Sequence, residues 1–371
     1  MSKKIILKAV ASYMLLLFII SCGNNSVNNS EKGETTHFDT LFPKYANGFY
    51  ILSSNNNQYV LVLQDENRNP VYRYRLSSDS ATADVVIPVR RTVSFSSTHY
   101  GFLESLHQEN IIKGISGKDY LIAGNKDEIE EIGISSNLNF EKIISLQPQI
   151  VFGNALGGEN QTLEEKFKQF NILYLPVSEY TEDSPLARAE WIKLFGLLTG
   201  KLPQADSIFN HIEKQYLEWK NSVAEKFGKE KKPLVLMSFP YQNTWYVPGG
   251  KSFQATFIKD AGGEYIFQDS NQKNSFVADA ETILAKGREA DFWLNLNHIN
   301  SKKEIVAENK LFAQFKPFKN NSIYNNNKRM VGMANAYWQT GVVNPHRILE
   351  DIIRILHRDN KQNLYYYKKV E

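Results

Sequence analysis

The chain has a single cysteine and no marked excess of charge, and both features exclude classes of protein. Cys22 is the only cysteine among 371 residues, so neither an intramolecular disulfide nor a Cys-x-x-Cys pair can form. Lysine and arginine total 43 and aspartate and glutamate total 40, with the two signs interspersed along the chain. This balance gives no support to nucleic-acid binding.

Familiar catalytic patterns are also missing. The chain contains no His-Glu-x-x-His and no Gly-x-Ser-x-Gly. Gly250-Lys251-Ser252 resembles the end of a phosphate-binding loop, but Trp245 stands where that motif needs its first glycine. Acidic residues 127, 128, 130 and 131 form a charge cluster typical of a solvated surface rather than of a catalytic pair. The sequence therefore predicts no catalytic residue, no metal site and no cofactor.

The beginning of the chain has the pattern of a lipoprotein signal. Three lysines within the first eight residues accompany an apolar run over 9–20, which is too short for a comfortable membrane span. The run ends in Ile19-Ile20-Ser21-Cys22, a lipobox, although an ordinary secretory signal with an incidental cysteine is the alternative. Residues 23–36 are rich in Asn, Ser, Gly and Glu and predict a flexible tether. We expect a protein outside the cytoplasm, in the periplasm or on the envelope exterior, anchored to the membrane by acylated Cys22.

Residues 37–88 predict a β-rich extension. Strand-like runs over 48–52, 58–63 and 71–76 are separated by turn signals at 55–57 and 67–70. We expect a β-meander that packs on the following lobe.

From residue 91 onward, strand and helix patterns alternate. This alternation predicts βαβ units and largely parallel sheets, hence an α/β fold. An N-terminal α/β lobe is expected over 89–202, with a helix over 185–199 at its end. Pro203 opens a longer helix, and the segment 203–228 would span roughly 35–40 Å and bridge two lobes. A C-terminal α/β lobe is expected over 229–360, followed by a charged, tyrosine-rich tail over 361–371 with no assigned role.

Each half of the chain presents a glutamate at a predicted helix start. Glu141 follows the capping-type residue Asn139, and Glu281 follows Asp279, each by two positions. In both copies a strand-like run begins nine residues after the glutamate. Such a repeat indicates two similar lobes, each with one acidic point. Taken singly, either glutamate is better explained as complementing the dipole of its helix.

The order and spacing of several segments resemble those of the substrate-binding proteins of bacterial ABC importers for ferric siderophores, haem and cobalamin. These segments are Val93 to Thr98, Phe140 to Val151, Arg188 to Ile192, Trp245 to Gly250, Asp260 to Gly263, Ala280 to Ala285, and Tyr337-Trp338. The resemblance covers about residues 91–357. It implies two lobes joined by one long helix, a monomer, and docking of Glu141 and Glu281 into arginine pockets of a permease dimer.

Loops at the carboxyl ends of the predicted strands should form the ligand cleft. The expected ligand-binding residues are Ser97, Thr98, Tyr120, Arg188, Tyr241, Trp245, Tyr246, Arg329, Tyr337 and Trp338. The alternatives are inter-lobe packing for the aromatic residues and a structural ion pair for Arg188. A ferric siderophore fits this inventory best.

Other ligands and one other class of protein stay open. His99 with a cleft tyrosine could ligate haem iron. Cobalamin binders of this kind carry a tryptophan in the loop before the first glutamate, and residues 134–139 have none. A chelatase-like enzyme of similar fold is a further alternative, against which the lipobox argues.

Overall fold

The computed structural model describes residues 38–41, 43–54, 57–134, 137–154, 159–242, 244–359 and 363–371. The expected signal peptide, Cys22 and the tether lie outside the described residues. Within these described ranges, no helix is both long and apolar enough to cross a membrane. Residues 37–371 form one unit.

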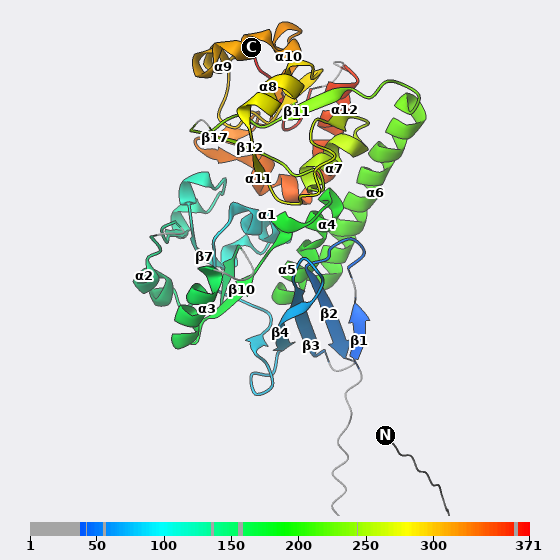
Figure 1. Cartoon of the computed structure of the whole chain (residues 1–371). Helices are drawn as coiled ribbons and strands as arrows, with labels where there is room; N and C mark the ends of the chain where they lie inside the picture. Colours follow the sequence, from blue (N-terminus) through cyan, green and yellow to red (C-terminus); the bar gives the residue numbers. More distant parts are fainter. Residues whose placement is uncertain are drawn as a thin grey trace, which may run out of the picture. The chain divides into compact units, whose positions relative to one another are not determined.

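The extension is a five-stranded sheet in sequence order. Its strands are β1 Phe38–Leu41, β2 Phe49–Ser54, β3 Tyr59–Gln64, β4 Pro70–Ser77 and β5 Val85–Val86. The first four form the expected antiparallel meander, whereas β5 pairs parallel with β4. Phe49 of β2 packs edge-on against Trp191 with ring centroids 4.9 Å apart, so the sheet rests on the N-terminal lobe (Figure 1).

Two buried glutamates of the N-terminal lobe fix the loop between β1 and β2. Glu190 accepts backbone N–H groups from residues 44, 45 and 46, and Glu182 accepts those of Asn47 and Gly48. Both side chains are at most 5% exposed. The partners are 134 to 146 residues apart in sequence, so no local pattern predicts these contacts.

The N-terminal lobe is built on a parallel sheet with the order β10-β9-β6-β7-β8. The strands are β6 Thr92–Ser94, β7 Ile112–Ile115, β8 Glu130–Glu131, β9 Ile150–Gly153 and β10 Leu173–Pro176. The helices are α1 Ser97–Ser105, α2 Phe140–Ser145, α3 Glu159–Gln169, α4 Pro185–Glu190 and α5 Ile192–Thr199. The single helix expected over 185–199 is thus two helices. They meet at Trp191, whose N–H bonds to the Arg188 carbonyl three residues back, a tight turn of 3-10 type.

The long helix α6 spans Leu202–Phe227 and contacts both lobes. Its 26 residues extend about 39 Å. Ala205 packs closely on Gly196 of α5. Further along, the Tyr216 hydroxyl donates to Asp260 of the C-terminal lobe at 2.9 Å, and Lys220 pairs with the same carboxylate. Figure 1 shows α6 running from the level of α5 to that of α12.

The C-terminal lobe has a mixed sheet with the order β13-β11-β15-β16-β19. Strands β11 Leu234–Met237, β13 Glu264–Tyr265, β15 Phe292–Leu294 and β16 Ile323–Asn325 are parallel, and β19 Lys368–Lys369 is antiparallel. Two antiparallel pairs of strands form separate two-stranded sheets: β12 Trp245–Val247 with β14 Phe276–Ala278, and β17 Met330–Val331 with β18 Ala334–Asn335. The helices are α7 Phe253–Asp260, α8 Ala280–Arg288, α9 Lys302–Glu308, α10 Lys316–Lys319, α11 Ala336–Gln339 and α12 Pro345–Leu356.

The described part of the tail completes this lobe. Tyr366 and Tyr367 are 0% exposed, and the carboxylate of Asp351 on α12 accepts the backbone N–H groups of residues 365, 366 and 367. The tail therefore has a structural role that its charged, tyrosine-rich composition does not reveal.

Short 3-10 helices connect several of these elements: η1 Glu109–Ile111, η2 Lys118–Tyr120, η3 Lys126–Glu128, η4 Glu179–Thr181, η5 Lys310–Gln314 and η6 Gly341–Val343.

Candidate ligand-binding cleft

One wall of the cleft comes from the carboxyl ends of the N-terminal lobe's strands. Ser96 follows β6, Asn154 follows β9, and η4 follows β10. Ser96 also caps α1, because its hydroxyl accepts the N–H of Thr98 at 3.1 Å. Ligands of open α/β sheets bind outside the carboxyl ends of the strands. This wall of the cleft therefore lies at the edge of the sheet where a ligand is expected.

The C-terminal lobe supplies the opposite wall. It contributes Pro248 after β12, the start of α7 with Phe253, the segment 273–275 before β14, and Trp338 of α11. The two walls enclose a cavity of about 560 Å³, a volume suited to a small organic ligand or metal complex.

Arg188 and Glu179 line this cavity and form a buried ion pair. The guanidinium lies 3.4 Å from the carboxylate, and the two side chains are 12% and 4% exposed. The guanidinium also lies over the ring of Phe253, 4.1 Å from its centroid, and so bridges the lobes. Burial raises the pKa of Glu179, and the charge of Arg188 opposes that rise. Among the described residues, the Arg188 Nε has no hydrogen-bond acceptor.

Three of the expected ligand-binding residues line the cavity: Thr98, Arg188 and Trp338. Thr98 and Trp338 come from different lobes, and the Thr98 hydroxyl donates to the Trp338 carbonyl at 3.4 Å. Trp338 keeps 42% of its surface exposed. Ser97 lies between two lining residues but does not itself line the cavity. Arg188 lines the cavity and also forms the structural ion pair that was its alternative role.

Trp245 and Tyr337 are core residues in the structure, which contradicts their expected place in the cleft. Trp245 is 5% exposed and stacks on Trp293, with ring centroids 6.0 Å apart. Tyr337 is 4% exposed and packs edge-on against Tyr366 and Tyr367. Successive residues of a strand face opposite sides, and the run Trp245-Tyr246-Val247 is apolar on both, so the sequence cannot tell which ring points inward.

Four other expected residues lie on the surface outside the cavity lining. Tyr120, Tyr241 and Tyr246 are each more than half exposed. Arg329 lies over the ring of Tyr365, 4.3 Å from its centroid. The structure does not bring these residues together with Thr98, Arg188 and Trp338.

His99 does not reach the cleft. Its side chain is 0% exposed, packs against Phe152 and Phe195, and lies 3.0 Å from the Ser94 hydroxyl. Burial lowers the pKa of His99 to about 3, so the ring is neutral. The expectation that His99 could ligate haem iron is therefore wrong for this conformation.

Sequence reasoning missed Glu179, Tyr180, Phe253 and Lys273, which all line the cavity. Phe253 had a local signal, because Ser252 is a helix-capping residue two positions after the segment Pro248-Gly249-Gly250. Glu179 and Lys273 had none, since nothing near them in sequence distinguishes them from surface charges.

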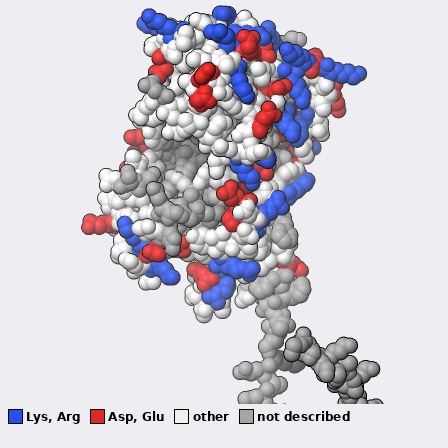
Figure 2. All heavy atoms as spheres, viewed as in Figure 1, with Lys and Arg blue, Asp and Glu red and all other residues white. Residues whose placement is uncertain are grey.

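Glu141 and Glu281 occupy equivalent positions on the two lobes. Each is exposed in the first turn of its helix, α2 or α8. The caps predicted from the repeat are present: Asn139 accepts the N–H of Lys142 at 2.9 Å, and Asp279 accepts that of Thr282 at 2.6 Å. On the face shown in Figure 2, positive and negative side chains are interspersed.

Known proteins resemble this chain over most of its length. An uncharacterized lipoprotein of Methanocaldococcus jannaschii is 29% identical over 286 residues, which cover 73% of this chain and 66% of the relative. The chain thus spans slightly less than two thirds of that relative. A periplasmic haem-binding protein of Pseudomonas aeruginosa has the same fold, with a TM-score of 0.61, 14% identity, and coverage of 76% of this chain and 98% of that one.

A solved structure from Staphylococcus epidermidis, described as a possible iron-binding periplasmic solute-binding protein, also shares the fold. It has a TM-score of 0.53 and 19% identity, and the match covers 74% of this chain and 99% of that one. A model of the periplasmic binding protein family matches residues 93–329, well over half of the chain. The chain therefore belongs to the periplasmic binding protein family.

Proposed function

We propose that this protein is the extracytoplasmic receptor of an ABC importer, which captures an iron complex of the ferric-siderophore class and delivers it to the permease. The observation that carries the proposal is the cavity of about 560 Å³ lined from both lobes in a chain of this family. A receptor binds its cargo unchanged and in one-to-one ratio, which distinguishes it from the alternative of a chelatase-like enzyme.

The lining favours a complex that brings its own iron ligands. A ferric siderophore needs polar and aromatic contacts from the protein, and hydroxyl, amide, guanidinium and indole groups line the cavity. The iron-binding description of the Staphylococcus epidermidis neighbour supports this class. Haem is the first alternative, because the Pseudomonas aeruginosa neighbour binds it, but the buried His99 offers no axial ligand. Cobalamin is the second alternative.

Glu141 and Glu281 are the proposed contacts to a permease dimer. Both carboxylates are exposed at helix starts on separate lobes, which suits two-point docking on arginine-lined pockets. The lipoprotein relative supports attachment through acylated Cys22 and a position outside the cytoplasm. We propose that the protein acts there as a monomer.

Tryptophan-fluorescence titration of the protein without residues 1–36 tests the cargo. The panel contains ferric hydroxamate, catecholate and citrate complexes, haemin and cobalamin. Trp338 borders the cavity and should report binding. Saturable one-to-one quenching by a ferric siderophore at sub-micromolar concentration is expected. Quenching by haemin or cobalamin alone would replace the ferric siderophore by that compound as the proposed cargo. Formation of a product from any compound of the panel would support the chelatase-like enzyme instead.

Docking is tested by Glu141→Ala combined with Glu281→Ala. This double variant should lose uptake of radiolabelled iron in cells while its affinity for the ligand in solution stays unchanged. Glu225→Ala, at an exposed position on α6, is the matched control and should transport normally. Normal transport by the double variant, or loss of ligand affinity, would contradict the docking role.

A further inference from the structure

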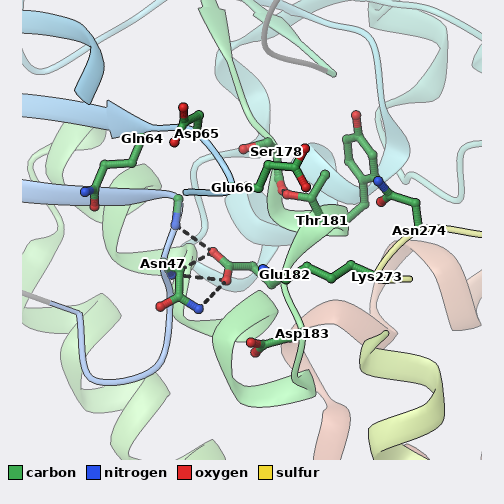
Figure 3. A pocket seen from close by; sticks show the side chains of 12 residues that line it. Asn47, Gln64, Asp65, Glu66, Ser178, Thr181, Glu182, Asp183, Lys273 and Asn274 are labelled. Carbon is green, nitrogen blue, oxygen red and sulfur yellow. Dashed lines mark hydrogen bonds between the residues drawn. The ribbon is translucent and has the colours of Figure 1, made fainter. Parts of the chain in front are cut away.

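A second cavity of about 280 Å³ lies beside the ligand cleft. The two share the lining residues Tyr180, Lys273 and Asn274, so the second cavity adjoins the cleft. Figure 3 shows its side chains converging from the extension and from the lobes. We call this second cavity the annex.

The outer wall of the annex belongs to the N-terminal extension. The loop residues Asn47 and Gly48, and the turn Gln64–Glu66 at the end of β3, line it. The extension precedes residue 93, where the match to the periplasmic binding protein family begins. This chain therefore adds to the shared cleft a wall that the family model does not include.

The annex wall is held in place by buried hydrogen bonds. The Glu182 carboxylate accepts N–H groups from Asn47 and Gly48 and from the Trp191 indole, at 2.9 to 3.1 Å. At Gly48 an added Cβ would lie 2.5 Å from the Trp191 ring, so only glycine allows this approach. The Asp65 carboxylate fixes its own turn by accepting the N–H groups of Asn67 and Asn69. These bonds lower the pKa of Asp65, which is therefore an anion at neutral pH.

Negative charge predominates in the annex. Four carboxylates line it, those of Asp65, Glu66, Glu182 and Asp183, against the single ammonium of Lys273. Among the described residues, the carboxylates of Glu66 and Asp183 have no hydrogen-bond donor or cation as partner. Burial raises the pKa of Glu182, the hydrogen bonds from Trp191, Gly48 and Asn47 oppose that rise, and the charge of Asp183 adds a smaller increase.

We propose that the annex receives a cationic arm of the ligand, a protonated amine, while the metal chelate of the same ligand occupies the cleft. This inference rests on the proposed receptor function and narrows its cargo. Glu66 and Asp183 take no part in the bonds that hold Glu182 and Asp65, so their carboxylates remain to pair with such an ammonium group. A polyanionic catecholate or citrate complex would instead meet an excess of like charge.

A pair of probes that differ in one charge tests the proposal. The first is a linear ferric trihydroxamate with a free terminal amine, and the second is the same complex with that amine acetylated. The full mature protein should bind the amine form roughly threefold to tenfold more tightly, as expected for one partly buried ion-pair contact. The difference should shrink in high salt because solvent ions screen the charges.

Neutralising variants locate the effect. Glu66→Gln with Asp183→Asn should abolish the preference for the amine form and leave the affinity for the acetylated form unchanged. Glu225→Gln, which removes an exposed carboxylate far along α6, is the matched control and should keep the preference. Circular dichroism and thermal unfolding of each variant establish that it is folded.

The failures of the two proposals are distinguishable. Equal binding of both probes, or a preference that survives Glu66→Gln with Asp183→Asn, would overturn the role of the annex and leave the receptor function standing. Binding of neither probe, with tight binding of ferric citrate, a catecholate complex or haemin, would overturn the cationic-arm proposal and redefine the cargo. Binding of no iron complex would overturn the proposed function itself.

Discussion

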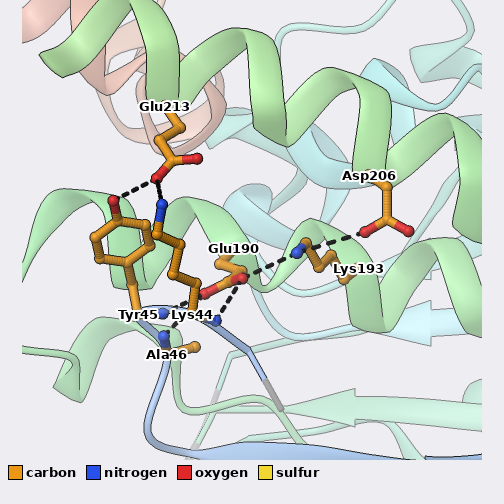
Figure 4. Close-up of polar contacts among 7 residues, drawn as sticks. All are labelled: Lys44, Tyr45, Ala46, Glu190, Lys193, Asp206 and Glu213. Atoms are coloured by element: carbon orange, nitrogen blue, oxygen red, sulfur yellow. Dashed lines mark hydrogen bonds and ion pairs between the residues drawn. The ribbon is translucent and has the colours of Figure 1, made fainter. Parts of the chain in front are cut away.

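Replacing Glu190 by glutamine should loosen the N-terminal extension from the rest of the protein. The Glu190 side chain is 0% exposed. One of its oxygens accepts the backbone N–H of Lys44 at 2.8 Å, and the other accepts those of Tyr45 and Ala46 at 2.7 and 3.1 Å (Figure 4). The ammonium of Lys193 lies 3.0 Å from the first oxygen. A single carboxylate thus connects the loop before β2 to α4 and α5.

The size of the loss follows from what glutamine can replace. An amide has one acceptor oxygen, so its NH₂ group must face at least one of the three backbone donors. A hydrogen bond to a charged group contributes about 1.5–3 kcal/mol, and a buried donor left without an acceptor costs about 1–3 kcal/mol. The free energy of unfolding should therefore fall by about 3–5 kcal/mol, a large part of the 5–15 kcal/mol typical of folded proteins.

Urea denaturation followed by tryptophan fluorescence measures this loss. Glu130→Gln is the matched control, because Glu130 is 53% exposed and pairs with Lys142 at the surface. The control should unfold at the same urea concentration as the unaltered protein. A loss below about 1 kcal/mol for Glu190→Gln would refute the reasoning, since it would mean that water or a rearranged loop satisfies the three donors equally well.

Three further predictions concern the cores and the cleft. Burial lowers the pKa of His99 from 6.5 to about 3, so below pH 6.5 the unfolded chain binds a proton that the folded chain does not. The free energy of unfolding should fall by about 2 kcal/mol from pH 7 to pH 5, and His99→Gln should remove this part of its pH dependence. If the variant keeps the same pH dependence, the lowered pKa of His99 is not its cause. Trp338→Ala should weaken ligand binding by about 1–3 kcal/mol in a fluorescence or calorimetric titration, whereas Trp245→Phe should leave the affinity unchanged. A loss of affinity in Trp245→Phe but not in Trp338→Ala would show that Trp245 leaves the core. Arg188→Ala should lower the free energy of unfolding, measured with urea at pH 7, by about 3 kcal/mol, because it leaves the Glu179 carboxylate buried and unpaired. Adding Glu179→Gln to this variant should restore part of the loss. A double variant no more stable than Arg188→Ala would contradict the ion-pair explanation.

Much of the fold could be predicted because its signals are local. Asn139 and Asp279 are capping residues by chemistry, and each accepts the expected backbone N–H. Pro203 and the apolar period after it predicted α6 to within one residue at its start. Alternation of strands and helices predicted parallel sheets, and the sheet of the N-terminal lobe is entirely parallel among its described strands.

The candidate site was less predictable because its signals are not local. Glu179 resembles any surface glutamate in the sequence, yet it is 3% exposed and pairs with Arg188. Trp245 and Tyr246 are adjacent and similar in chemistry, but one is buried and the other 54% exposed. Residues 363–371 look like a solvated tail, and only the position of Asp351 on α12 explains why they fold against the lobe.

The contact between the lobes bears on the proposed docking of Glu141 and Glu281. The side chain of Gln339 on α11 is 1% exposed and bonds both the N–H and the carbonyl of Ile122 in the N-terminal lobe, at 2.8 and 2.7 Å. Beside it, an added Cβ at Gly101 would lie 1.9 Å from the Gln339 carbonyl oxygen, so α1 and α11 approach as closely as glycine allows. A wide hinge opening would have to break these buried bonds and expose their donors and acceptors. Because Trp338 precedes Gln339, the same short helix that joins the lobes also borders the cleft. The spacing of Glu141 and Glu281 is therefore set by the packing of the two lobes, as the proposed two-point docking requires.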